Sequence, residues 1–180
     1  MMSLRIILLC IAAAVLYGLL HDQITVRICL EYFTVAHPRI IRSDSPTVIA
    51  LYWGFAATWW VGVLLGIPLA FASRACARPR LSAAQLARPI AILLVVMAFC
   101  ALASGITGFL LVSRGNLEIG YWADLIPPSL HARFQADAFA HLASYGVGFL
   151  GGIVVVIWAI LRRRKMHLRA GQPAQEPKLS

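Results

Sequence analysis

Charged residues are scarce in this chain, and acidic residues are the scarcest. Asp and Glu together number seven in 180 residues, and all charged residues make up 13% of the sequence against 61% for hydrophobic residues. Soluble globular domains contain about 25% charged residues. The shortage therefore excludes an ordinary soluble domain and, with a mean hydropathy of +0.80, predicts an integral membrane protein.

Several chemical motifs are missing as well. The sequence has no P-loop, no dinucleotide-binding glycine pattern, no GxSxG and no HExxH. The four cysteines show no CxxC spacing, and only Cys29 is expected in an outer loop, so no internal disulfide is predicted. No apolar segment has an ionisable residue near its centre, where proton pumps and ion-driven transporters usually keep one. Any site is therefore expected at the rim of the membrane.

What the chain has in abundance is long apolar runs. About 20 apolar residues in a helix cross the hydrocarbon core of a bilayer. Residues 4–20, 48–71, 89–112 and 141–161 meet or nearly meet this length. We predict an all-α transmembrane fold, a four-helix membrane bundle over residues 1–165, with outer loops 21–47 and 113–140 and a disordered tail over 166–180. For the short first segment an uncleaved signal anchor is favoured, and a cleaved signal peptide is the alternative.

The distribution of charge predicts the orientation of these segments. Six of the seven acids lie in the loops 21–47 and 113–140, whereas residues 72–88 carry four arginines and no acid. By the positive-inside rule both termini are cytoplasmic. The basic residues flank apolar segments and form no stripe, so lipid bilayer and not nucleic acid is the expected partner. A run after the last segment is expected to meet anionic lipid headgroups: Arg162, Arg163, Arg164 and Lys165.

Small residues recur at every fourth position in two segments. Such stripes let helix backbones approach closely in lipid. The stripe in the second segment contains Gly54, Thr58, Gly62 and Gly66, and the stripe in the fourth contains Ser144, Gly148 and Gly152. Packing within a monomer is favoured, and the alternative is a docking face for a homo-oligomer or a membrane-protein partner.

The first outer loop alternates apolar and polar residues. Over residues 23–33 this period of two predicts an extracytoplasmic β-strand, and a second alternation over residues 117–121 offers a pairing partner. The two segments would form a small β element above the bundle. The competing interpretation continues the first helix to about Phe33.

Titratable residues gather where two segments reach the outer rim. Arg133, Asp137 and His141 are spaced four apart and share a helix face, and His21 and Asp22 are expected at a similar depth. Imidazole and carboxylate groups suit a divalent metal, so His21, Asp22, Asp137 and His141 are candidate ligands. The favoured alternative is a polar lock in which Arg133 pairs with Asp137 and His141 is hydrogen-bonded to Asp137. An acid/base site at His141 or His21 is a further alternative.

Three short motifs in the first loop carry a resemblance. The sequence reads HDQ at residues 21–23, EYFT at 31–34 and HP at 37–38, followed by DSPT and a Trp-rich segment. In this order the motifs resemble a group of uncharacterised bacterial multi-pass membrane proteins, over about residues 17–69. The resemblance implies a bacterial origin and a four-span membrane fold, and it implies no activity.

These patterns predict a small protein of the bacterial inner membrane that acts by binding, as an accessory or assembly subunit of a membrane complex. A metal or acid/base enzyme site at the outer rim is the first alternative. The second is a passive channel or small-molecule carrier, for which the segments offer few polar lining residues.

Overall fold

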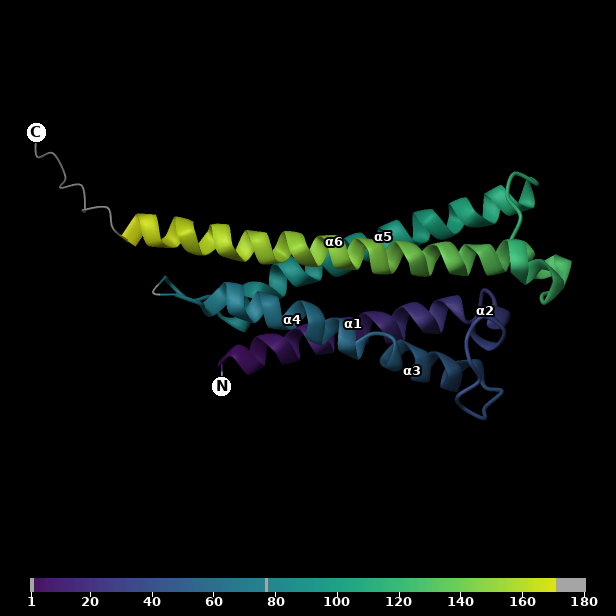
Figure 1. Cartoon of the computed structure of the whole chain (residues 1–180), viewed down its shortest axis with the longest axis horizontal. Helices are drawn as coiled ribbons and strands as arrows, with labels where there is room; N and C mark the ends of the chain where they lie inside the picture. Colours follow the sequence, from purple (N-terminus) through teal and green to yellow (C-terminus); the bar gives the residue numbers. More distant parts are fainter. Residues whose placement is uncertain (1, 77, 171–180) are drawn as a thin grey trace, which may run out of the picture.

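Four helical spans lie side by side along the long axis of the molecule (Figure 1). The computed structural model describes residues 2–76 and 78–170, and this part of the chain contains no β-strand. Four segments are long and apolar enough to cross a membrane: Ser3–Thr25, Pro46–Arg74, Ala83–Ser113 and Pro128–Ala170. The prediction of a multi-pass, all-α membrane protein is thus confirmed.

The helices differ in length and continuity. In chain order they are α1 (Met2–Thr25), α2 (Leu30–Thr34), α3 (Pro46–Ala56), α4 (Trp59–Arg74), α5 (Ala83–Ser113), the 3-10 turns η1 (Gly120–Asp124) and η2 (Pro128–Leu130), and α6 (His131–Ala170). We call the end of the bundle with α2, η1 and η2 the loop end. The end with the N-terminus and the connection between α4 and α5 is the terminal end.

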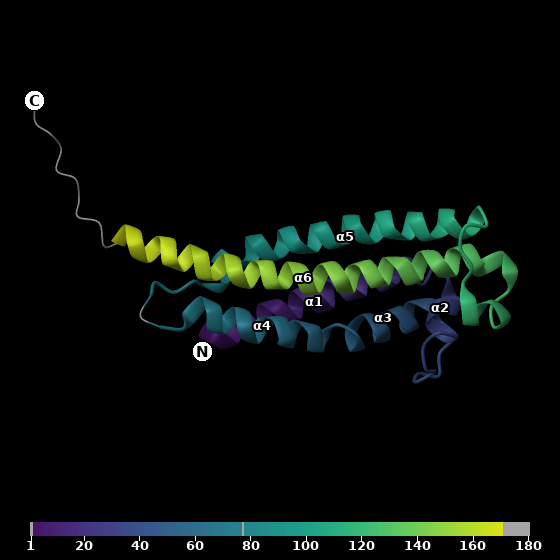
Figure 2. The same cartoon turned by 45° about the horizontal axis from the view of Figure 1, so that its top comes forward.

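The bundle is built from two helix pairs. Helix α1 lies along α3 and α4, and α5 lies along α6 (Figures 1 and 2). Glycine makes the first pair close: a Cβ on Gly62 would lie 2.5 Å from the Cα of Ile11, and one on Gly54 would lie 2.8 Å from the Cα of Leu19. The small-residue stripe that ends at Gly66 therefore packs against α1, inside the chain.

The stripe of α6 joins the two pairs. A Cβ on Gly152 would lie 2.7 Å from the Leu65 side chain of α4, and one on Gly148 would lie 3.0 Å from Met97 of α5. At the loop end of this stripe, the hydroxyl groups of Ser144 and Tyr17 are 2.8 Å apart and form a hydrogen bond. Helix α6 thus contacts both halves of the bundle, which also meet where α1 contacts α5.

The second span is interrupted, although the sequence predicts one helix over residues 48–71. Helix α3 ends at Ala56 and α4 begins at Trp59. At the break the Thr58 hydroxyl donates to the carbonyl of Gly54, and the backbone N–H of Thr58 donates to Phe55 (3.2 Å) in a tighter turn. A threonine that bonds back to the carbonyl four residues earlier competes with regular helix geometry, which explains the break.

The β element expected at the loop end does not form. Helix α1 continues to Thr25, a turn follows, and α2 begins at Leu30, while residues 120–124 form η1. Val26, Cys29 and Phe33 are each 2% exposed, a helical spacing of three and four, whereas Ile24 is 65% exposed. In a bilayer an outward-facing isoleucine has no cost, so the alternation in the sequence did not identify the buried face.

The terminal end is closed by a buried arginine. Arg163 of α6 is 4% exposed, and its guanidinium donates to carbonyl oxygens of the last turn of α4 and of the α4–α5 connection: Ala72 (2.7 Å), Ala75, Arg78 (3.3 Å) and Pro79 (2.8 Å). It therefore points into the protein, away from the headgroups that the sequence assigned to it. Arg162, Arg164 and Lys165 are exposed. Helix α6 includes residues 166–170 of the expected tail, and residues 171–180 lie outside the described residues.

Candidate functional site

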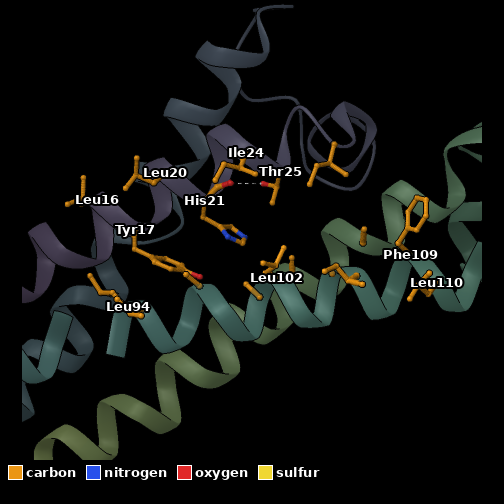
Figure 3. A pocket seen from close by; sticks show the side chains of 18 residues that line it. Leu16, Tyr17, Leu20, His21, Ile24, Thr25, Leu94, Leu102, Phe109 and Leu110 are labelled. Atoms are coloured by element: carbon orange, nitrogen blue, oxygen red, sulfur yellow. Dashed lines mark hydrogen bonds between the residues drawn. The ribbon is translucent and has the colours of Figure 1, made fainter. Parts of the chain in front are cut away.

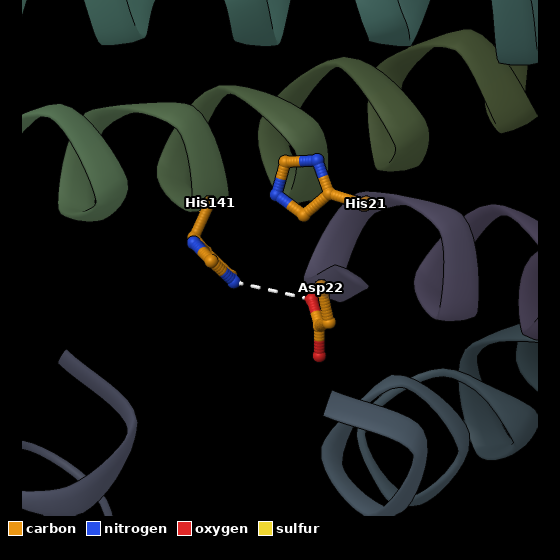
Figure 4. Close-up of side chains that lie close together, drawn as sticks. All are labelled: His21, Asp22 and His141. Atoms are coloured by element: carbon orange, nitrogen blue, oxygen red, sulfur yellow. Dashed lines mark ion pairs between the residues drawn. The ribbon is translucent and has the colours of Figure 1, made fainter. Parts of the chain in front are cut away.

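Helices α1 and α6 bring three polar side chains together near the loop end. His21 and Asp22 come from α1 and His141 comes from α6 (Figure 4). The His141 Nε2 and the Asp22 Oδ1 are 3.3 Å apart. Each of the three residues offers one ligand atom, and these atoms all lie within 4.8 Å of one another. The sequence analysis had named all three as metal-ligand candidates.

A backbone contact fixes the orientation of the His141 ring. Its Nδ1 lies 2.8 Å from the carbonyl oxygen of Asp137, one helical turn earlier. Because a carbonyl only accepts, Nδ1 carries the proton and donates it. The Nε2 that faces Asp22 therefore either holds a free lone pair or, in the imidazolium form, a second proton.

Asp137 is placed differently from the expected polar lock. Ion pairs among residues 2–76 and 78–170 join Arg39 with Asp44 and His141 with Asp22, so the predicted pairing of Arg133 with Asp137 is not formed. Arg133 faces outward, whereas Asp137 is 0% exposed. The reason is that a guanidinium keeps its hydration at the surface, while position 137 turns into the bundle.

The Asp137 carboxyl is an unusual buried group. Neither of its oxygens has a hydrogen-bond partner among the described residues. The nearest backbone donor, the N–H of Cys29, is directed to the carbonyl of Thr25 (3.1 Å). An unpaired carboxylate is costly in a buried position. A proton on Asp137 or a nearby cation would remove this cost.

An aromatic cap covers the polar cluster. The ring of His21 stacks on Tyr17 with centroids 5.5 Å apart and meets the His141 ring edge-on at 4.6 Å. From α2, Tyr32 and Phe33 approach His141 at 4.5 Å and 5.6 Å. Asp22 and His141 are only 6% and 8% exposed as a result. The cluster is thus largely shielded from water.

Burial keeps two titratable side chains near the cluster neutral, the Tyr32 phenol of the cap and the Cys29 thiol beside it. Burial raises the pKa of the Tyr32 phenol above its ordinary value, and the charges of nearby acids add to this effect. Burial likewise raises the pKa of the Cys29 thiol to about 12. A thiol with such a pKa is a poor nucleophile at neutral pH, so Cys29 lines the site without reacting there.

An apolar groove runs beside the cluster between α1 and α5 (Figure 3). It has a volume of about 670 Å³, and its floor is formed by α6. Leu20 and Ile24 form part of one wall, and Leu102 and Ile106 part of the other. His21 also lines this groove, so its ring separates the groove from Asp22 and His141. All these residues lie within segments that are long and apolar enough to cross a membrane.

Sequence reasoning missed the groove and the cap. The groove arises because α1 and α5 belong to different helix pairs, and the tilt between pairs is not visible in a sequence. Tyr17 precedes His21 by four residues, which places the two rings on one helix face and is the signal that could have linked them.

His37, expected in a loop, is held there by a bond between its Nδ1 and the Tyr32 carbonyl (2.8 Å).

Comparison with known proteins gives no name for this arrangement. No protein-family model, no curated protein and no solved structure matches the chain.

Proposed function

We propose that this protein acts by binding a long-chain amphiphile, taken up from the bilayer into the groove between α1 and α5, with the polar head at His21. The observation that carries the proposal is the double position of His21. Its side chain lines the apolar groove and also belongs to the buried polar cluster with Asp22 and His141. A ligand in the groove would therefore meet its first titratable group there.

The chemistry of the groove supports an amphiphile. Its lining contains no Asp, Glu, Lys or Arg, and apart from His21 its polar side chains are Tyr17 and Thr25. Both hydroxyls are already engaged, that of Tyr17 with Ser144 and that of Thr25 with the His21 carbonyl. The Nε2 of His21 has no hydrogen-bond partner among the described residues. One unpaired polar atom beside a long apolar wall matches a molecule with one polar end.

The volume also fits such a ligand. Ligand sites commonly measure about 300–1,000 Å³ and combine apolar walls with a few polar groups. The groove has about 670 Å³ and opens along spans that are apolar enough to lie in the bilayer. A membrane lipid or fatty acid can then enter sideways without crossing water.

Photo-crosslinking with an alkyne-tagged diazirine palmitic acid tests the proposal on the full chain in lipid nanodiscs. We expect saturable labelling that unlabelled palmitic acid competes away and that maps to α1 and α5. Ala98 is an exposed residue in the groove, so Ala98→Phe fills the space. We expect this change to lower labelling about tenfold, equivalent to 1.4 kcal/mol of binding free energy.

A matched variant controls for the added bulk. Ala103 lies on the same helix and is exposed outside the groove, so Ala103→Phe should label like the wild type. Labelling that does not saturate, that spreads evenly over the four spans, or that is equal in the two variants would contradict the proposal.

The orientation and location of the protein belong to the same proposal. The arginines of the α4–α5 connection and the basic end of α6 support an orientation with both termini in the cytoplasm, and the resemblance of the first loop supports a bacterial inner membrane. Cys76 is exposed and lies in that connection, so a membrane-impermeant maleimide should label it only after the cells are opened. Labelling in intact cells would reverse the orientation.

A role as an accessory subunit stays a prediction, and a partner that co-purifies in mild detergent would support it.

A further inference from the structure

We infer that His21, Asp22 and His141 form a binding site for a divalent first-row transition metal, with the fourth position left open for a small ligand. This inference goes beyond the binding of an amphiphile and shares with it only the position of His21. The three residues meet at the loop end from two helices that are far apart in sequence.

The spacing of the ligand atoms fits a metal centre. Zinc binds histidine nitrogen and carboxylate oxygen at about 2.0–2.2 Å, which places the ligand atoms of a tetrahedral site about 3.4 Å apart. The His141 Nε2 and the Asp22 Oδ1 are 3.3 Å apart, already at that separation. The ligand atom of His21 lies within 4.8 Å of both. A small rotation of the His21 side chain would complete a three-sided site.

The second coordination layer is in place for His141. Metal-bound histidines usually donate their other ring N–H to a carbonyl or carboxylate, which fixes the tautomer and aims the lone pair at the metal. The Nδ1 of His141 makes this bond to the Asp137 carbonyl at 2.8 Å. The lone pair of Nε2 then points toward Asp22, in the direction that coordination requires. Asp137 thereby acts as a positioning residue through its backbone.

The balance of buried charge favours a cation. Asp22 and Asp137 are 6% and 0% exposed, and their carboxyl groups are near enough to interact electrostatically. The described ion pair of Asp22 is with His141, and Asp137 has no described partner. A buried Asp22 carboxylate beside a neutral imidazole leaves uncompensated negative charge, which is costly in a low-dielectric interior. A divalent ion would offset it.

The donor set narrows the choice of metal. Two imidazoles and one carboxylate suit Zn²⁺ or Fe²⁺, whereas Mg²⁺ and Ca²⁺ prefer oxygen ligands. Three protein ligands leave a coordination position open, as in catalytic and not in structural zinc sites. His21 lies between this position and the groove, so the fourth ligand could come from that side.

Metal analysis of the full chain tests the inference. The protein is purified in mild detergent, stripped with a chelator, dialysed against Zn²⁺ or anaerobic Fe²⁺, and analysed by inductively coupled plasma mass spectrometry. We expect about one metal ion per chain in the wild type with at least one of these metals. Each of His141→Gln, His21→Gln and Asp22→Asn should lower the metal content at least tenfold at the same free-metal concentration.

A second histidine provides the matched control. His131 also lies at the loop end, bonds through its ring to the Ile126 carbonyl (2.8 Å) and is not part of the cluster. His131→Gln should retain one metal ion. Because a cluster variant could also lose metal by misfolding, the thermal melting of each apo-protein is measured. A metal-dependent rise in melting temperature should occur in the wild type and His131→Gln only.

The outcomes separate this inference from the proposed function. Substoichiometric metal in a folded wild type, or equal metal content in His141→Gln and His131→Gln, would overturn the metal site. Neither result bears on palmitic acid labelling, which depends on the groove and not on the ion. Conversely, a failure of labelling with one metal ion bound would overturn only the amphiphile.

Discussion

Replacement of Arg163 by methionine is expected to lower the free energy of unfolding by about 3 kcal/mol. The guanidinium of Arg163 is buried and donates to four backbone carbonyls that close the connection between α4 and α5. Methionine fills a similar space but donates nothing, so it leaves these carbonyls unpaired. Hydrogen bonds from a charged group are each worth about 1.5–3 kcal/mol, and water that enters at the terminal end will recover part of the loss. Unfolding by sodium dodecyl sulfate, followed by circular dichroism, measures the change.

The neighbouring arginine gives the control for lost charge. Arg164 is exposed, and Arg164→Met removes the same charge without removing a described hydrogen bond, so its effect should stay within about 0.5 kcal/mol. Equal destabilisation by both variants would mean that basic charge at the end of α6, and not the buried contacts of Arg163, stabilises this end.

A comparable loss is expected for Gly62→Leu at the centre of the first helix pair. A Cβ at position 62 would lie 2.5 Å from the Cα of Ile11 and 2.9 Å from the carbonyl oxygen of Cys10. Both are backbone atoms, which cannot rotate away as a side chain can, so α1 and α4 must separate. Overpacking typically costs 1–3 kcal/mol, and a backbone clash along a helix pair should reach the upper end, about 3 kcal/mol.

Gly146 tests whether this cost comes from the clash. It lies on α6, and a Cβ there would have no neighbour within 4 Å among the described atoms. Gly146→Leu should therefore be neutral or slightly stabilising, because leucine favours a helix more than glycine does. If Gly62→Leu unfolds at the same detergent concentration as Gly146→Leu, the stripe on α4 is not a packing surface for α1.

The sequence was sufficient for the spans and insufficient for the loop end. Apolar length identifies a membrane helix because the bilayer imposes it, and all four segments were found in this way. In a bilayer, however, an alternation of apolar and polar residues does not show which face is buried. Ile24 and Ile28 belong to the apolar set of the predicted strand, yet they face outward at 65% and 40% exposure. In water such residues would have been buried on one face of a strand. The break at Thr58 accompanies the bond from its hydroxyl to the Gly54 carbonyl, which apolar length alone does not reveal.

Helix periodicity predicted only part of the candidate site. His21, Asp22 and His141 were expected at one depth, and they meet. Asp137 was expected to pair with Arg133 and to hydrogen-bond with His141; the ion pair is absent among the described residues, and the hydrogen bond forms through the Asp137 carbonyl. The spacing places residues 133, 137 and 141 on one helix face but does not show which of them reaches the surface. The cap from Tyr32 and the groove depend on contacts between distant segments and were not predicted.

The position of His21 between the groove and the polar cluster is tested most directly by cobalt spectroscopy. Co²⁺ is loaded into the chelator-stripped full chain as a visible probe of the inferred metal site, and palmitic acid is then added. If the head of a groove ligand reaches the cluster, the visible absorption bands of Co²⁺ will shift saturably in the wild type and in Ala103→Phe, but not in Ala98→Phe. A Co²⁺ spectrum that palmitic acid leaves unchanged in the wild type, while palmitic acid still labels the groove, would contradict the view that groove and cluster form one site.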